Sequence, residues 1–118
     1  MTDSNRIKLS DFGLSSKLNT KKLVFGNVGT PNLMAPEVRT KSEEGYLGIP
    51  ADLWSCGIVL HYMLYGSYPF NKESSSQGHI DSRYINVSKH AKELLAGIIK
   101  LDPKKRLSIP EIQSHPWM

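Results

Sequence analysis

The most apolar stretch of the chain lies between Asp52 and about Tyr65. Apolar residues there fall on almost every side of a helical projection, and Gly66 follows as a typical helix stop. A helix that is apolar all round is a buried helix. The pattern therefore predicts a helix from Asp52 to about Tyr65 that is buried on every side and forms the centre of the core.

Two further helices are predicted on the carboxy-terminal side. Residues 89 to 100 repeat apolar side chains at helical spacing behind Ser88, a favourable N-cap. The apolar positions of this predicted helix are Ala91, Leu94, Leu95, Ile98 and Ile99. A last short helix is expected to open at Ser108, because Ser108 and Glu111 have capping-box spacing and Pro110 is tolerated in a first turn.

The sequence of the amino-terminal half predicts little regular structure there. Ile7–Ser10 alternates apolar and polar residues after a turn-like start, which predicts a short strand. Glycines and prolines are so frequent between residues 14 and 50 that only a turn or two of helix can form, after Ala35-Pro36-Glu37. The polar run from Asn71 to Gly78 predicts a loop. We expect one mainly α domain with a long irregular segment, of the kind that usually carries function.

Composition places the chain among globular proteins. Its 118 residues are 39% hydrophobic and 22% charged, which is too mixed for a disordered chain. The net charge is +4, but the basic residues stand in small groups, Lys21-Lys22 and Lys104-Lys105-Arg106, without interleaved aromatic residues. This pattern argues against a nucleic-acid-binding protein. No run approaches the roughly 20 apolar residues that cross a bilayer, which argues against a membrane protein.

The single cysteine, Cys56, lies inside the apolar stretch and cannot form an internal disulfide. We expect it to be a small buried thiol. A lone thiol and a polar start without a signal-peptide pattern favour a reducing, intracellular location. The cytoplasm is the favoured compartment, and the nucleus is compatible with the same pattern.

Short motifs supply the candidate chemistry. Asp11-Phe12-Gly13 follows the predicted strand, and a carboxylate on a glycine-containing turn can hold a metal ion against phosphates. Alone, this tripeptide fits an ordinary strand-to-loop turn equally well. The order and spacing of four further motifs along the chain make the ordinary turn the weaker interpretation. They are Gly29-Thr30-Pro31-Asn32-Leu33-Met34-Ala35-Pro36-Glu37, Asp52-Leu53-Trp54-Ser55-Cys56-Gly57, Leu101-Asp102-Pro103-Lys104-Lys105-Arg106 and His115-Pro116-Trp117.

In this order the motifs resemble those of the eukaryotic protein kinases, and the resemblance covers the whole chain. Gly29-Thr30-Pro31 ahead of Ala35-Pro36-Glu37 resembles the serine/threonine type. Ala51–Gly57 together with Tyr68-Pro69-Phe70 is most similar to the calcium/calmodulin-dependent and sucrose-non-fermenting-like group. The resemblance implies that residues 1–118 are a partial kinase domain. It would be a carboxy-terminal-lobe fragment with a short strand, the activation segment and the helical core.

The resemblance also implies roles for a cofactor-binding turn and a supporting threonine. Asp11 would chelate the magnesium ion that bridges the phosphates of ATP. Phe12 would pack against the small lobe, and Gly13 completes the cofactor-binding triplet. Thr30 would support catalysis by hydrogen bonding to the catalytic aspartate and lysine of an upstream loop.

Three structural anchors follow from the same resemblance. Glu37 would pair with Arg106 through a bidentate, partly buried salt bridge that fixes the activation segment to the helical core. Asp52 would be a largely buried carboxylate that accepts backbone amide hydrogen bonds from the catalytic loop. The alternatives are an exposed surface carboxylate for Glu37 and a helix N-terminal acid for Asp52.

Several parts of a working kinase are missing from these 118 residues. They contain no glycine-rich loop, no strand lysine paired with a helix glutamate and no His-Arg-Asp catalytic loop. We therefore expect the chain alone to transfer no phosphate and not to bind magnesium and ATP. Two hypotheses stay open. The chain is part of a serine/threonine kinase that acts on protein substrates, or it is a non-catalytic kinase remnant that binds the missing kinase half or another chain.

Overall fold

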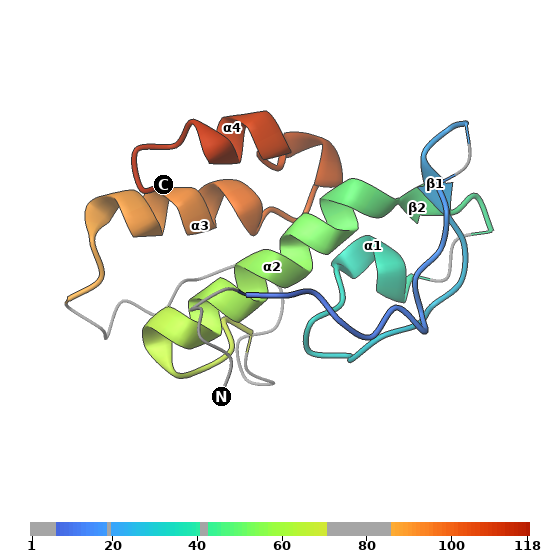
Figure 1. The fold of residues 1–118 in the computed structure, drawn as a ribbon, viewed down its shortest axis with the longest axis horizontal. Helices are drawn as coiled ribbons and strands as arrows, with labels where there is room; N and C mark the ends of the chain where they lie inside the picture. Colours follow the sequence, from blue (N-terminus) through green and yellow to red (C-terminus); the bar gives the residue numbers. More distant parts are fainter. Residues whose placement is uncertain (1–6, 19, 41–42, 71–85) are drawn as a thin grey trace.

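The computed structural model describes residues 7–18, 20–40, 43–70 and 86–118 (Figure 1). Four helices, a 3₁₀ turn and a two-stranded sheet make up its regular structure. The helices are α1 (Pro36–Arg39), α2 (Gly48–Tyr65), α3 (Lys89–Ile98) and α4 (Ile109–Gln113), with the 3₁₀ turn η1 at Pro103–Lys105. The strands are β1 (Leu23–Val24) and β2 (Tyr46–Leu47). The predicted mainly α architecture is confirmed for this part of the chain.

Helix α2 crosses the middle of the molecule, with α3 and α4 along one side and α1 and the sheet near its amino-terminal end (Figure 1). It begins at Gly48, four residues before the predicted start, because Pro50 fits within a first helical turn. Gly66 ends it in the left-handed conformation with φ 67°, as expected. The central helix of the sequence prediction is therefore present.

The predicted burial of α2 on every side is wrong. Its buried side chains follow one face, at Ala51, Trp54, Ile58, His61 and Tyr65. The opposite face is exposed and apolar, with Val59 at 45% and Met63 at 69% of full exposure. Cys56 lies on this face, so the predicted buried thiol is exposed. An apolar sequence run shows that a face can be buried but does not show what covers it.

The predicted carboxy-terminal helices are confirmed, together with their caps. The hydroxyl of Ser88 accepts a hydrogen bond from the Ala91 amide at 3.2 Å, and α3 buries Ala91, Leu94, Leu95 and Ile98. At the start of α4, the Glu111 carboxylate accepts hydrogen bonds from the backbone amide and the hydroxyl of Ser108, at 2.7 and 2.6 Å. These bonds hold the pKa of Glu111 below its usual value. Local capping chemistry therefore sets both helix starts.

The amino-terminal segment differs from the prediction. Ile7–Ser10 is not a strand, and Ile7 is 96% exposed, because no strand among the described residues pairs with it. The sheet lies elsewhere, where β1 and β2 pair in antiparallel fashion with Leu23 opposite Leu47. Each strand has only two residues, which is too short to show an alternating pattern. The single turn α1 confirms the expected helix after Ala35, whereas the predicted loop at 71–78 lies outside the described residues.

The main core cluster joins α1 to α2. It contains the buried side chains Ala35, Val38, Ala51, Trp54 and Ile58. The Trp54 ring stacks on Phe70, with 5.4 Å between ring centroids and 2° between ring planes. Across residues 7–18, 20–40, 43–70 and 86–118, no helix has both the length and the apolarity needed to cross a membrane.

The contact between α2 and α3 depends on a glycine, which gives a test of the fold. A Cβ atom added at Gly57 would lie 2.7 Å from Ile98 Cγ2 and 3.0 Å from Ile99 Cγ1. Gly57→Ala gains about 1 kcal/mol of helix propensity but forces these side chains apart. Since overpacking costs about 1–3 kcal/mol, we expect a net loss in the free energy of unfolding, measured by urea denaturation. Gly13→Ala, whose Cβ meets only the Asp11 side chain at 3.6 Å, is the control. A stabilised Gly57→Ala variant would contradict this packing.

Candidate functional site

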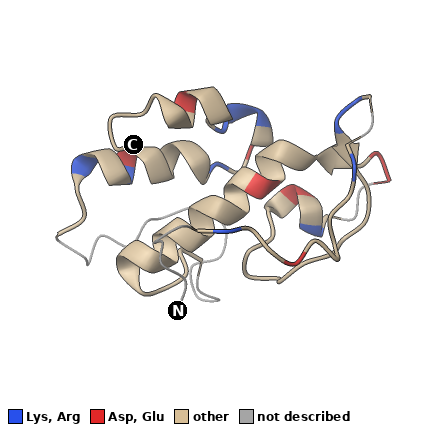
Figure 2. Cartoon of the chain, viewed as in Figure 1, with Lys and Arg blue, Asp and Glu red and all other residues tan. Residues whose placement is uncertain are grey.

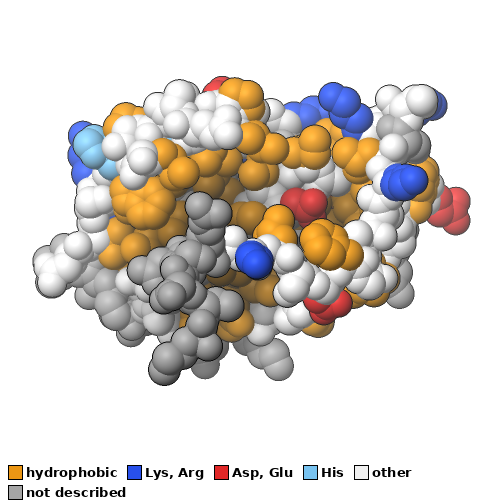
Figure 3. Space-filling model, in the orientation of Figure 1, with side chains coloured by type: hydrophobic (Ala, Val, Ile, Leu, Met, Phe, Trp, Pro, Cys, Tyr) orange, Lys and Arg blue, Asp and Glu red, His pale blue; other side chains and the backbone are white. Residues whose placement is uncertain are grey.

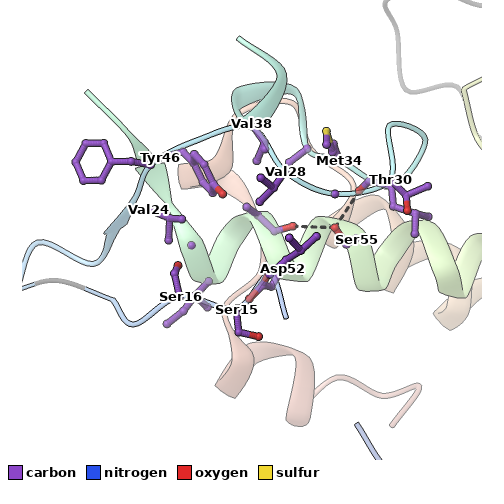
Figure 4. A pocket seen from close by; sticks show the side chains of 18 of the residues that line it. Ser15, Ser16, Val24, Val28, Thr30, Met34, Val38, Tyr46, Asp52 and Ser55 are labelled. Atoms are coloured by element: carbon purple, nitrogen blue, oxygen red, sulfur yellow. Dashed lines mark hydrogen bonds between the residues drawn. The ribbon is translucent and has the colours of Figure 1, made fainter. Parts of the chain in front are cut away.

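A cavity of about 510 Å³ opens between the amino-terminal segment, the 24–35 segment and the start of α2 (Figure 4). Asp11, Thr30 and Asp52 all line it, so three of the predicted site residues meet at one place although they span 41 positions of sequence. Its size falls in the ordinary range of ligand pockets. This cavity is the candidate functional site.

Asp11 lies at the edge of the cavity, directly before a turn. Its backbone has φ 63°, in the left-handed region, which aspartate tolerates better than most residues. The Ser15 amide donates to the Phe12 carbonyl at 3.0 Å and closes the turn. Phe12 is 67% exposed and does not line the cavity, and Gly13 does not line it either. Of the predicted cofactor-binding triplet, only Asp11 faces the site.

Thr30 begins a tight turn that the helical core holds in place. Its carbonyl accepts hydrogen bonds from the amides of Leu33, at 2.9 Å, and Met34, at 3.2 Å. The Ser55 hydroxyl of α2 donates to the Leu33 carbonyl at 2.9 Å and lies 3.4 Å from the Ala51 carbonyl (Figure 4). Sequence reasoning missed Ser55, although it lies three residues after Asp52 in a motif that had already been identified.

Asp52 lies in the second turn of α2 and is exposed at the cavity, so the expectation of a largely buried carboxylate is wrong for this structure. Its neighbours still remove part of its solvation, which raises the pKa of Asp52 above its usual value. The pKa of Tyr46, which also lines the cavity, is raised first by desolvation and then by the charges of Asp52 and Glu37. The cavity is therefore a region of negative potential.

The predicted contact between Glu37 and Arg106 is present. Arg106 Nη1 donates to Glu37 Oε1 at 2.6 Å, and Nη2 donates to Oε2 at 2.8 Å. The Arg106 side chain is only 1% exposed and that of Glu37 is 17% exposed. This is a bidentate, largely desolvated pair, so the alternative of a surface carboxylate for Glu37 does not hold.

Arg106 has further partners that the sequence did not indicate. Its Nε donates to the Lys100 carbonyl at 2.8 Å, and Nη1 also donates to the Pro50 carbonyl at 2.8 Å. Nη2 lies 3.4 Å from the Leu101 carbonyl. The guanidinium group also lies over the Trp54 ring, with its carbon 4.9 Å from the ring centroid. One side chain thus joins α1, the start of α2 and the segment that follows α3.

The described residues do not by themselves fit a magnesium–ATP site. Asp11 and Asp52 are the acidic side chains that line the cavity, and within the described ranges no lysine or arginine lines it. No group of three His, Cys, Asp or Glu side chains in this part of the chain is placed to hold a metal ion. Magnesium takes six oxygen ligands, and the phosphates of a nucleoside triphosphate need cationic groups to bind them. Asp11 could supply one ligand of such a site, and the others must come from elsewhere.

Comparisons with known proteins agree with the order of the motifs. The family model for the protein kinase domain matches residues 1–118. The chain is 36% identical to the serine/threonine-protein kinase SRK2F of Arabidopsis thaliana, over 97% of this chain and 35% of the relative. It is 38% identical to SAPK3 of Oryza sativa subsp. indica, over 95% of this chain and 36% of the relative. The chain therefore spans about a third of the length of these curated relatives.

The buried ion pair gives a stability test. Arg106→Ala leaves the Glu37 carboxylate largely desolvated and unpaired, so we expect a loss of about 3 kcal/mol or more in the free energy of unfolding. Arg106→Lys should recover little of it, because an ammonium group cannot reproduce the two-pronged contact. Urea denaturation, monitored by tryptophan fluorescence, measures the free energy of unfolding of both variants, with the exposed Lys104→Ala as control. Equal midpoints for Arg106→Ala and Lys104→Ala would show that the pair does not anchor the fold.

The raised pKa of Asp52 predicts a pH-dependent effect on stability. Because this pKa is higher in the folded than in the unfolded chain, ionisation of Asp52 opposes folding above its unfolded value. Asp52→Asn should therefore raise the free energy of unfolding at pH 7, and the gain should disappear near about pH 3, where the carboxyl group is protonated. Glu93→Gln, at an exposed position on α3, is the control. A gain of equal size at both pH values would contradict the assignment.

Proposed function

The chain belongs to the protein kinase domain family, and from this premise we propose that it forms the activation segment and carboxy-terminal helical core of a serine/threonine kinase. The reaction of the whole enzyme is transfer of the γ-phosphoryl group of ATP to a serine or threonine hydroxyl of a protein substrate. The sucrose-non-fermenting-like and calcium/calmodulin-dependent kinases are the proposed nearest group. An intracellular, cytoplasmic or nuclear, location belongs to the same proposal.

One observation carries the proposal. The Arg106–Glu37 bridge holds the 29–37 segment against the helical core, beside the cavity that Asp11, Thr30 and Asp52 share. Phosphoryl transfer depends mainly on positioning and electrostatic stabilisation. A segment that seats a protein substrate must therefore be fixed, and a buried bidentate pair does this better than a loop alone.

Within this proposal, each cavity residue has a role that its position permits. Asp11 would give one carboxylate ligand to magnesium once other residues complete the site. Thr30, on a turn fixed by Ser55, would hydrogen bond to the catalytic loop. Asp52 is exposed at the cavity, so its carboxylate is available to accept backbone amides from that loop. The 118 residues of this chain position these groups but supply no catalytic base.

We propose that the 118 residues alone are catalytically incompetent. They contain no His-Arg-Asp sequence and no glycine-rich loop. The second candidate, a non-catalytic kinase remnant that binds another protein chain, is favoured by the exposed apolar face of α2 around Val59 and Met63. Hydrophobic side chains form a broad band on the face drawn in Figure 3. Large exposed apolar patches mark protein contacts.

Lysines and arginines are scattered over several elements (Figure 2). Those among the described residues do not form the basic stripe that is typical of nucleic-acid-binding proteins. This distribution supports protein substrates or protein partners as the ligands of the whole molecule, and neither nucleic acid nor a membrane.

A phosphoryl-transfer assay tests the proposal. We expect the 118-residue chain to transfer no radiolabelled γ-phosphate from ATP to a generic protein substrate. A fusion that joins this chain to the part of SRK2F on the amino-terminal side of the matched region should transfer phosphate to serine and threonine. Asp11→Ala should abolish that transfer, and Glu93→Gln should leave it intact.

Two outcomes would contradict the proposal. Transfer by the chain alone that Asp11→Ala abolishes would show that it is competent by itself. A fusion that unfolds cooperatively but transfers no phosphate would favour the non-catalytic remnant instead.

A further inference from the structure

Side chains from two different helices hold the turn at residues 30–34 by its backbone carbonyls. From α2, the Ser55 hydroxyl donates to the Leu33 carbonyl at 2.9 Å. From α1, Arg39 Nη2 donates to the Pro31 carbonyl at 2.5 Å. Arg39 is the last residue of α1, and its side chain reaches back eight positions along the chain. The turn that carries Thr30 is therefore fixed at two points.

Arg39 holds this turn from outside the cavity. Thr30 and Leu33 line the cavity, whereas Pro31 and Arg39 are exposed and do not line it. Among the described residues, the Pro31 carbonyl is the one hydrogen-bond partner of the Arg39 side chain. Arg39 therefore leaves the groups assigned to magnesium and the catalytic loop unobstructed. A contact in this place can position the turn without taking part in the chemistry.

Helix α1 gives Arg39 a fixed base. Glu37, two residues earlier, is bound at both carboxylate oxygens by Arg106. The hydroxyl of Thr40, the next residue along the chain, donates to the Glu37 carbonyl at 2.8 Å and closes the end of α1. The backbone of Arg39 is thus anchored to the helical core while its side chain holds the turn. One such hydrogen bond at an exposed site shifts a local equilibrium by about threefold to tenfold.

We propose that Arg39 is a positioning residue that keeps the 30–34 turn in the arrangement that seats a protein substrate. The inference rests on the proposed kinase function. When the turn is loose, only a fraction of the molecules can accept the substrate, and the apparent affinity for the protein substrate falls by that fraction. Once the substrate is bound, the turn is ordered again, so kcat changes little. Binding of ATP does not involve this turn.

Amide hydrogen exchange in the 118-residue chain tests the contact itself. Arg39→Met removes the donors but keeps the length and the helix propensity of the side chain. We expect the amides of Leu33 and Met34, which close the turn, to exchange about threefold to tenfold faster. The Ile99 amide at the end of α3 is the internal control. Arg39→Lys should recover part of the protection, because a single carbonyl needs only one donor. Unchanged exchange at Leu33 and Met34 in Arg39→Met would overturn the proposal.

Steady-state kinetics of the fusion with the amino-terminal part of SRK2F test the role in substrate binding. Arg39→Met should raise KM for the protein substrate by about threefold to tenfold, while kcat and KM for ATP change by less than about twofold. A general loss of folded protein would instead lower kcat and leave both KM values unchanged. Arg39→Lys should restore part of the KM. Lys104→Met, which removes an exposed cation from η1, should leave all three constants unchanged.

The two measurements separate the possible failures. Faster exchange in Arg39→Met together with an unchanged KM for the protein substrate would overturn the positioning role and leave the proposed kinase function intact. A fusion that transfers no phosphate would overturn the proposed function, and the role of Arg39 in substrate binding with it. The exchange result then shows separately whether Arg39 holds the turn.

Discussion

The Arg106 guanidinium group is the interaction on which the rest of this structure depends. It donates to both carboxylate oxygens of Glu37 and to the carbonyls of Lys100 and Pro50, and it lies over the Trp54 ring. A charge that is only 1% exposed is stable in a protein only when its hydrogen bonds are satisfied. Because its partners come from α1, α2 and the segment that follows α3, satisfying this one group fixes these three parts of the chain relative to one another.

The contacts of Arg106 also determine the geometry of the candidate site. Glu37 belongs to α1, so the ion pair fixes the end of the segment that carries Thr30. Ser55 of α2 fixes the middle of the same segment, because its hydroxyl donates to the Leu33 carbonyl.

 Val59, four residues after Ser55, is 45% exposed, whereas Ala51, Trp54 and Ile58 on another side of α2 are buried. The same helix therefore presents a fixed site at its start and an uncovered apolar face further along.

The sequence predicts well those features, such as helix starts, that depend on contacts between residues close together in the chain. Ser88 and Ser108 mark helix starts because their caps need only neighbours within three residues. The pairing of Glu37 with Arg106 spans 69 positions and followed from the motif resemblance rather than from any local pattern. Ile7–Ser10 failed as a strand because a strand also needs a partner, which no described residue supplies. Cys56 was placed in the core because an apolar run does not reveal which of its faces is covered.

A double-mutant cycle on Glu37 and Arg106 tests the central claim most directly, because it isolates the coupling between the two side chains from their other contacts. The free energy of unfolding would be measured for the parent chain, Glu37→Ala, Arg106→Ala and the double variant. The account predicts a coupling energy of about 2 kcal/mol or more, as expected for a largely desolvated bidentate pair. Single-variant losses that add to within about 0.5 kcal/mol in the double variant would contradict it.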